Sequence, residues 1–118
     1  MPTEVGSEFP YVLVMERGGQ SLFIENVTQR IAGVNARTVS KLFRSLCGRV
    51  AALHTLGLVH GDLKLRNVIR RFGEVDVCLC DLDAALPIDS VRSIDVKSSS
   101  AYAAPELQVR SVLFTVTF

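Results

Sequence analysis

The sequence predicts an α+β fold that is mainly helical, with a β-hairpin beside a polar loop. Residues 36–56 give the clearest helical signal, because apolar side chains recur there every three or four positions and form one stripe. Residues 74–80 show the two-residue period of a strand, and a second strand over 67–70 completes the hairpin. The loop that joins the helix to the hairpin, residues 60–67, concentrates acidic, basic and amide side chains.

Ahead of the long helix, short elements alternate with breaks. Residues 9–15 are a run of aromatic and β-branched residues that predicts a buried strand. The glycine pair at 18–19 follows this strand, and adjacent glycines favour a turn. We expect residues 21–29 to form a short helix with an irregular apolar face, and residues 31–35 to form a connector.

Local signals mark both ends of the long helix. Asn35 is expected to cap its start, and Gly57 stands where a helix commonly stops. The hairpin that follows is expected to turn at residues 71–73. It places Asn67 at the start of one strand and Asp81 at the end of the other, so that two residues 14 positions apart lie close together.

The last third of the chain has weaker signals. Residues 84–101 are polar and irregular, which is typical of a surface loop. Residues 112–118 alternate apolar and polar side chains, as strands do, and an exposed strand of this kind tends to aggregate.

Composition excludes several classes of protein. A chain of 118 residues predicts a single domain, and 48% apolar residues argue against disorder. The net charge of +1 argues against binding to nucleic acid or to a membrane surface, and no apolar run is long enough for a membrane-spanning helix. The start of the chain is polar and acidic, unlike a signal peptide. Three cysteines without zinc-site spacing are expected to be reduced, buried thiols of a cytoplasmic protein: Cys47, Cys78 and Cys80.

The loop at 60–67 carries the chemistry. Asp62, Lys64 and Asn67 lie within six positions, so one loop can aim a proton acceptor, a cation and a metal-binding amide at one place. Phosphoryl transfer needs this set, because it depends on positioning and charge neutralisation more than on covalent chemistry. Two further motifs follow, Asp81-Leu82-Asp83 and Ala104-Pro105-Glu106.

Together the three motifs resemble a known family. His60-Gly-Asp-Leu-Lys-Leu-Arg-Asn67 is similar to the protein kinase catalytic loop, His-Arg-Asp-x-Lys-x-x-Asn. The other two motifs are similar to the kinase Asp-Phe-Gly and Ala-Pro-Glu motifs, and they occur in kinase order at kinase-like distances. The resemblance covers about residues 11–106 and leaves 107–118 as an atypical tail. It implies that residues 1–118 are a partial protein kinase domain, mostly the helical large lobe with its catalytic-loop hairpin, with the small lobe largely missing.

The resemblance also implies catalytic roles. Asp62 would accept the proton of a substrate hydroxyl as it attacks phosphorus, and Lys64 would stabilise the charge of the transferred phosphoryl group. Asn67 and Asp81 would hold Mg²⁺, which prefers oxygen ligands. His60 would support the loop from below.

For ATP, the resemblance implies a second set of residues. Met15 would guard the back of the nucleotide pocket, the backbone from Glu16 to Gly18 would pair with adenine, and Ile69 would form an apolar floor beneath it. Residues 84–101 would be the activation segment, and the macromolecular partner would be a protein substrate.

The sequence departs from the family pattern in three ways. Gly61 replaces an arginine that commonly binds a phosphate on the activation loop, so we expect that loop phosphorylation is not the main switch. Asp83 replaces a glycine, whose backbone freedom an aspartate matches only at some cost. The glycine-rich phosphate loop and the lysine–glutamate pair are expected upstream of residue 1, so this chain alone is expected to bind ATP weakly and to transfer little phosphate.

The leading interpretation is a serine/threonine protein kinase, because Lys64 matches a lysine of that class. One alternative is a small-molecule phosphotransferase of the choline- or aminoglycoside-kinase kind, whose loops resemble His-Gly-Asp and whose metal motif often has two acids. Lys64 and residues 99–106 argue against it. Another alternative is a non-catalytic remnant, such as a pseudokinase or an interaction module, which the missing small lobe favours.

Overall fold

The computed structural model describes residues 11–92, 100–102, 105 and 114–115. In this part of the chain the helices are α1 (Leu22–Gln29), α2 (Ile31–Val34) and α3 (Ala36–Thr55), with 3₁₀ turns η1 (Leu65–Asn67) and η2 (Ser100–Tyr102). The strands are β1 (Gly18–Ser21), β2 (Leu58–Val59), β3 (Val68–Arg71), β4 (Val77–Leu79), β5 (Leu86–Pro87), β6 (Val91–Arg92) and β7 (Phe114–Thr115). Helices combined with small antiparallel sheets confirm the predicted α+β class.

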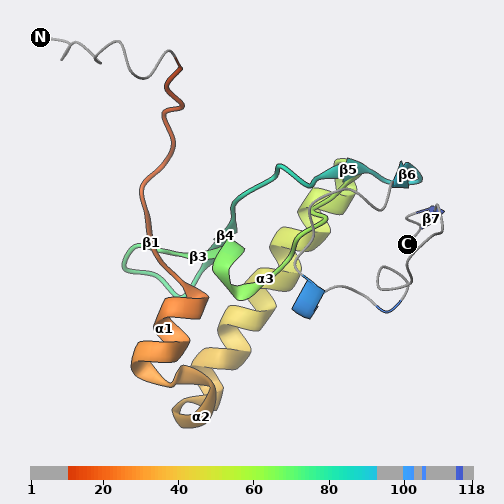
Figure 1. Cartoon of the computed structure of the whole chain (residues 1–118). Helices are drawn as coiled ribbons and strands as arrows, with labels where there is room; N and C mark the ends of the chain where they lie inside the picture. The colour runs from red at the N-terminus through yellow and green to blue at the C-terminus, as the bar shows by residue number, and fades with distance from the viewer. Residues whose placement is uncertain (1–10, 93–99, 103–104, 106–113, 116–118) are drawn as a thin grey trace, which may run out of the picture.

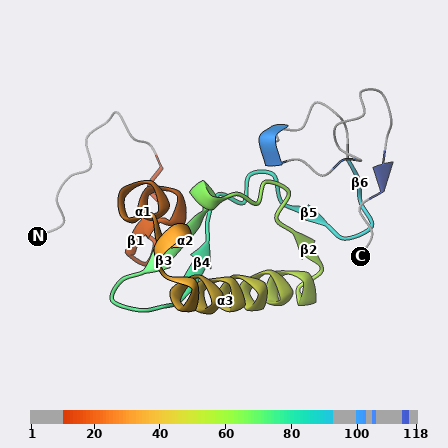
Figure 2. The same ribbon diagram turned by 90° about the horizontal axis from the view of Figure 1, so that it is seen from below.

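The strands form small sheets arranged along α3. The described sheets have the orders β1-β3-β4, β2-β5 and β6-β7, and every pairing is antiparallel. α3 is the longest element, and it contacts β4 and β2 (Figure 1). The β1-β3-β4 sheet lies beside the first part of α3, and the β2-β5 pair lies near its last turns (Figure 2). The loop from β2 to β3 runs between these two sheets.

The first helix and the turn after it follow local signals. Ser21 caps α1, because its hydroxyl accepts a hydrogen bond from the N–H of Ile24 at 3.4 Å. Arg30 ends α1 with a left-handed backbone at φ 50°. The helix predicted over 21–29 is therefore confirmed. The connector predicted over 31–35 is wrong in one respect, since most of it forms the single turn α2.

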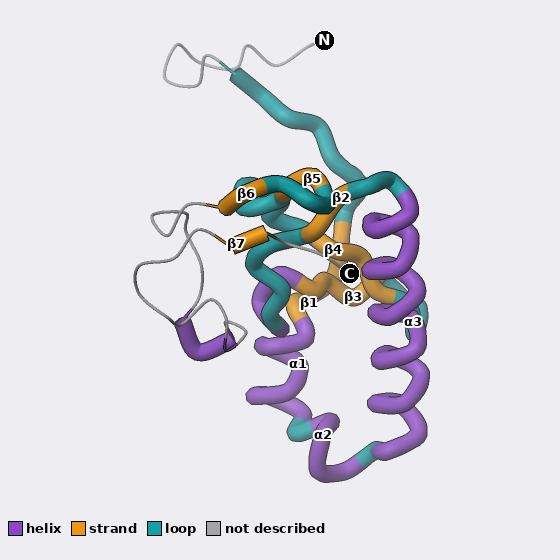
Figure 3. Tube along the Cα trace, turned by 90° about the vertical axis from the view of Figure 1, so that its right-hand side faces the viewer, coloured by secondary structure: helices purple, strands orange, loops and turns teal. Residues whose placement is uncertain are grey.

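The long helix matches its prediction over 36–56 within one residue. The side chain of Asn35 accepts a hydrogen bond from the N–H of Thr38 at 3.0 Å, which confirms the predicted cap. Gly57 follows the helix with a φ of 75°, a conformation that glycine adopts readily. α1 runs from β1 to α2, and α3 runs back from α2 past the β1-β3-β4 sheet (Figure 3).

The strand predicted over 9–15 is wrong for the residues that the structure describes, 11–15. These residues form no strand and are exposed, Tyr11 to 92% and Val14 to 89%. Residues 9–10 lie outside the described part. An apolar run forms a buried strand only where a sheet offers a partner edge, and here β1 pairs with β3 instead. Figure 1 shows the segment before β1 extending away from the helices.

A small apolar core joins α3 to the hairpin. Leu42 of α3, Val68 of β3 and Val77 of β4 are 5%, 1% and 0% exposed, respectively. Leu22, Leu46 and Leu79 pack against them. The predicted hairpin is confirmed, but its second strand is shorter than expected because residues 72–76 belong to the turn.

A polar network fastens the hairpin turn to α3. Asp76 accepts hydrogen bonds from the hydroxyl of Ser45 and from Nη2 of Arg49, the latter at 2.5 Å. Nε of Arg49 also donates to the carbonyl of Val77 at 2.9 Å. The hydrogen bond from Ser45 is the main cause that lowers the pKa of Asp76 from 3.8 to about 2, with a smaller contribution from Arg49, while partial burial opposes the shift. Asp76 is therefore ionised at neutral pH.

The cysteines are free thiols. Cys78 and Cys80 are partly buried, but the prediction of a buried thiol is wrong for Cys47, which is exposed on α3. Among the described residues, no helix combines the length and the apolar character needed to cross a bilayer.

Candidate active site

The loop between β2 and β3 gathers Asp62, Lys64 and Asn67 into one hydrogen-bonded cluster. Nζ of Lys64 donates to Oδ2 of Asp62 at 2.7 Å. Nδ2 of Asn67 donates to the backbone carbonyl of Asp62 at 2.9 Å and to its Oδ2 at 3.3 Å. The side chain of Asp62 is 6% exposed, so its negative charge depends on these donors in place of water.

His60 ties this loop to the chain just before Asp81. His60 is 3% exposed, and its Nδ1 accepts a hydrogen bond from the N–H of Asp62 at 3.3 Å. The ring proton therefore lies on Nε2, which is 3.0 Å from the carbonyl oxygen of Cys80 and donates to it. This geometry agrees with the supporting role that the resemblance implies for His60.

A backbone hydrogen bond joins Asn67 to Cys80, the residue before Asp81. The N–H of Cys80 donates to the carbonyl of Asn67 at 3.0 Å, which brings Asp81 next to the start of β3. The amide nitrogen of Asn67 is used by Asp62, so its amide oxygen is the atom suited to a metal ion.

The Asp81-Leu82-Asp83 segment takes a different backbone form from the one the sequence suggested. Asp81 has the left-handed conformation, with a φ of 62°, whereas Asp83 does not. Aspartate tolerates this conformation better than most residues. The aspartate that replaces glycine at position 83 therefore requires no backbone angle that favours glycine.

The structure explains why position 61 is a glycine, which the sequence alone did not. Its φ is 78°, and a Cβ atom at this position would lie 2.0 Å from the carbonyl oxygen of Ala84. Ala84 is itself only 4% exposed. An arginine at position 61, as in the family pattern, does not fit unless the loop and the segment at 81–84 move apart.

The residues predicted to contact ATP are only partly brought together. A Cβ atom on Gly18 would lie 2.4 Å from Cγ2 of Ile69, so these two residues lie against each other in β1 and β3. Met15 is 68% exposed in the segment before β1. The carboxylate of Glu16 is 2.6 Å from Nη2 of Arg71, which ties the end of that segment to the hairpin.

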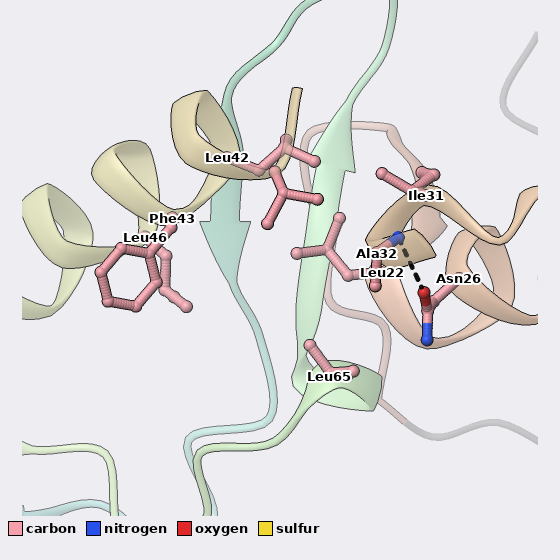
Figure 4. A pocket seen from close by; sticks show the side chains of 9 residues that line it. Leu22, Asn26, Ile31, Ala32, Leu42, Phe43, Leu46 and Leu65 are labelled. Carbon is pink, nitrogen blue, oxygen red and sulfur yellow. Dashed lines mark hydrogen bonds between the residues drawn. The ribbon is translucent and has the colours of Figure 1, made fainter. Parts of the chain in front are cut away.

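An apolar cavity lies next to the catalytic loop, whose Leu65 is part of its lining (Figure 4). It has a volume of about 170 Å³ and lies between α1, α2, α3 and η1. Its lining is almost entirely apolar: Leu22, Asn26, Ile31, Ala32, Val39, Leu42, Phe43, Leu46 and Leu65. Leu65 is the member contributed by the catalytic loop. The sequence did not predict these apolar surroundings of Leu65, because the apolar residues of α1 show no regular face.

The residues present fit a magnesium ion that is held jointly with phosphate. Within the part of the chain that the structure describes, no three histidine, cysteine or acidic side chains gather into a ready metal site. Magnesium needs no such cage, since one or two protein oxygens plus substrate phosphates and water complete its shell. Asn67 and Asp81, the latter next to Cys80, would supply two such oxygens.

Comparison with known proteins decides the family. The protein kinase domain family matches residues 5–113. The chain belongs to the protein kinase family. Membership confirms the resemblance to eukaryotic-type protein kinases.

Individual kinases are similar to the same region. The chain is 31% identical over 110 residues to MAP kinase-interacting serine/threonine-protein kinase 1 of Xenopus tropicalis, covering 82% of this chain and 26% of that protein. It is 31% identical over 100 residues to calcium-dependent protein kinase 12 of Arabidopsis thaliana, covering 80% and 20%. It is 33% identical over 99 residues to calcium-dependent protein kinase 2 of the same plant, covering 80% and 15%. The chain thus spans about a quarter or less of the length of these curated relatives.

Proposed function

We propose that this chain forms the catalytic part of a serine/threonine protein kinase, which transfers the γ-phosphoryl group of ATP to a hydroxyl of a protein. The observation that carries the proposal is the buried carboxylate of Asp62, bonded at once to Lys64 and Asn67. A carboxylate in this setting is placed to accept a proton, with a cation beside it for the phosphoryl charge. Lys64, and a relative whose name specifies serine/threonine, support that specificity.

Each residue of the cluster has a proposed role. Asp62 accepts the proton of the attacking hydroxyl, and Lys64 steadies the transferred group. Asn67 and Asp81 hold Mg²⁺, which, when bound, neutralises the phosphate oxygens. The hydrogen bonds of His60 keep the catalytic loop and the Asp81 segment in fixed relation.

The nucleotide side is proposed from the resemblance and from one contact. Gly18 and Ile69 lie against each other and offer the backbone and the apolar floor for adenine. Met15 and Glu16 complete that side. We propose that residues 1–118 are part of a larger kinase domain, with 107–118 as its atypical tail, because the chain covers only a fraction of its relatives. Binding of ATP by this chain alone is then weak, and little phosphate is transferred.

The same proposal extends to partners and location. ATP and a protein substrate are the expected partners, without nucleic acid or membrane. A cytoplasmic location, which the free thiols predict, is part of the proposal.

Calorimetric titration with ATP and Mg²⁺ tests the metal and nucleotide roles. We expect the chain to bind with a dissociation constant of about 1 mM or below, and Asp81→Asn to weaken binding about tenfold or more. Asp89→Asn is a matched control, because Asp89 is also exposed and left-handed, with a φ of 65°. Equal binding by Asp81→Asn and Asp89→Asn would refute the metal role.

A radiolabel assay with pooled serine- and threonine-containing peptides tests transfer itself. The expected result is a low rate that Asp62→Asn abolishes. A rate that survives in Asp62→Asn would remove Asp62 from its proposed role.

A non-catalytic role is the second candidate function. The observation that favours it is the exposure of Met15 to 68%, at a position that would have to form the back of a nucleotide pocket. Absence of MgATP binding in the calorimetric titration, with the chain folded, supports this second candidate.

A further inference from the structure

Arg66 places a positive charge beside the catalytic loop. It lies in η1, between Leu65, which lines the apolar cavity, and Asn67, which donates to Asp62. Its guanidinium carbon is 3.9 Å from the centre of the Phe23 ring. A stack at this distance holds the side chain against α1 and reduces its freedom.

Among the described residues, the positive charge of Arg66 is not neutralised by an ion pair. Within the described residues no carboxylate pairs with Arg66, whereas Arg49, Arg70 and Arg71 each pair with an acid. Lys64, the other cation of the loop, lies 2.7 Å from a carboxylate oxygen of Asp62.

The position of Arg66 leaves its hydrogen-bond donors usable. Its guanidinium carbon lies over the Phe23 ring, and the N–H groups of a guanidinium lie in its plane, at the edge. Arg66 is exposed, so an incoming group can reach that edge. A planar fork of donors matches the two oxygens of a carboxylate.

We propose that Arg66 selects the substrate by binding an acidic side chain close to the hydroxyl that is phosphorylated; this rests on the proposed function. A hydroxyl at Asp62 places the neighbouring residues of an extended peptide at steps of about 3.3 Å. Arg66 is four positions from Asp62 on the same loop, so an aspartate or glutamate within about three residues of the hydroxyl comes within its reach. A lysine at the same place meets a like charge.

Fluorescence anisotropy with labelled peptides tests the inference without requiring catalysis. Three peptides share one serine in a background of alanine and glycine, and carry glutamate, alanine or lysine on both sides of it. We expect the glutamate peptide to bind about three- to fivefold tighter than the alanine peptide, as one exposed ion pair allows, and the lysine peptide to bind weakest. Arg66→Glu should reverse this order, and Arg66→Lys should keep only part of the preference because it lacks the planar fork.

Arg44→Glu is the matched control for charge. Arg44 is exposed on α3 and lines a groove with Lys41, Arg49 and Asp76, and its replacement changes the net charge as much as Arg66→Glu does. The preference should persist in Arg44→Glu. Equal binding of the glutamate and alanine peptides by the unaltered chain overturns the inference, as does an absence of binding. Loss of the preference in both variants also overturns it, since overall charge then explains the result.

A titration with MgATP separates this inference from the proposed function. Weaker MgATP binding in Arg66→Glu, with the order of the peptides unchanged, assigns Arg66 to the nucleotide and overturns the inference. An unaltered chain that binds no MgATP, yet prefers the glutamate peptide through Arg66, refutes phosphoryl transfer while recognition of acidic peptides stands. If Arg66→Glu does not fold, the comparison of the three peptides and the Arg66→Lys variant still decide the outcome.

Discussion

Gly61→Ala tests whether the catalytic loop depends on its close approach to Ala84. A Cβ atom on Gly61 would lie 2.0 Å from the carbonyl oxygen of Ala84, and real Cβ atoms essentially never come closer than 3.0 Å. The two segments must therefore separate by about 1 Å. Ala84 is 4% exposed, so its surroundings leave little room for this movement.

The magnitude follows from two costs. A left-handed backbone costs an alanine about 1 kcal/mol, and separating packed segments costs about 1–3 kcal/mol. We expect Gly61→Ala to lower the free energy of unfolding by about 2–4 kcal/mol. Gly73→Ala is the matched control, because Gly73 has a φ of 76° with no atom within 4 Å of an added Cβ. It carries only the backbone cost of about 1 kcal/mol.

Urea denaturation followed by circular dichroism measures both variants, and calorimetry with MgATP reports on the site. Gly61→Ala should weaken MgATP binding, because the displaced segment at 81–84 contains Asp81, whereas Gly73→Ala should bind as the unaltered chain does. Equal destabilisation of the two variants would refute the close contact between Gly61 and Ala84. A large loss of stability with unchanged MgATP affinity would show that the contact does not position Asp81.

Two further predictions concern α3 and its polar network. An added Cβ at Gly48, inside α3, meets no atom within 4 Å. Gly48→Ala should therefore raise the free energy of unfolding by about 0.5–1 kcal/mol, which a higher urea midpoint would show. A lower midpoint would contradict the open surroundings of this site. The pKa of Asp76 is lowered in the folded chain, so the stability due to its charge is fully present above the ordinary pKa of 3.8 and is lost as the pH falls through about 2. Asp76→Asn should flatten this part of the profile of unfolding free energy against pH, and an unchanged slope would count against the role of Asp76.

Features with local signals could be predicted from the sequence. The bounds of α3 follow from a helical period and from Asn35, whose cap forms within three residues. The hairpin follows from alternation around a short turn. Asp62, Lys64 and Asn67 lie on one loop, so their approach needs no information about distant parts of the chain.

Features that depend on distant partners could not be predicted. The apolar run at 11–15 looks like a strand, but whether it pairs is decided by β1 and β3. Gly61 appears in the sequence only as a missing arginine, because its contact, Ala84, lies 23 positions later. Arg30, which follows the predicted end of α1, has a left-handed backbone although it is neither glycine nor asparagine, so no sequence signal indicates this backbone conformation.

The order of strands in the β1-β3-β4 sheet has a consequence for how the chain folds. β3 and β4 are consecutive in the sequence, whereas β1 reaches β3 only by closing a loop of about fifty residues between Gly18 and Arg71. Contacts between nearby residues form sooner, because less chain entropy is lost before they are made. We therefore expect α3 and the hairpin to form first, on either side of the catalytic loop. Asp62, Lys64 and Asn67 would then come together early, and the strand that carries Gly18 would be the last to pair.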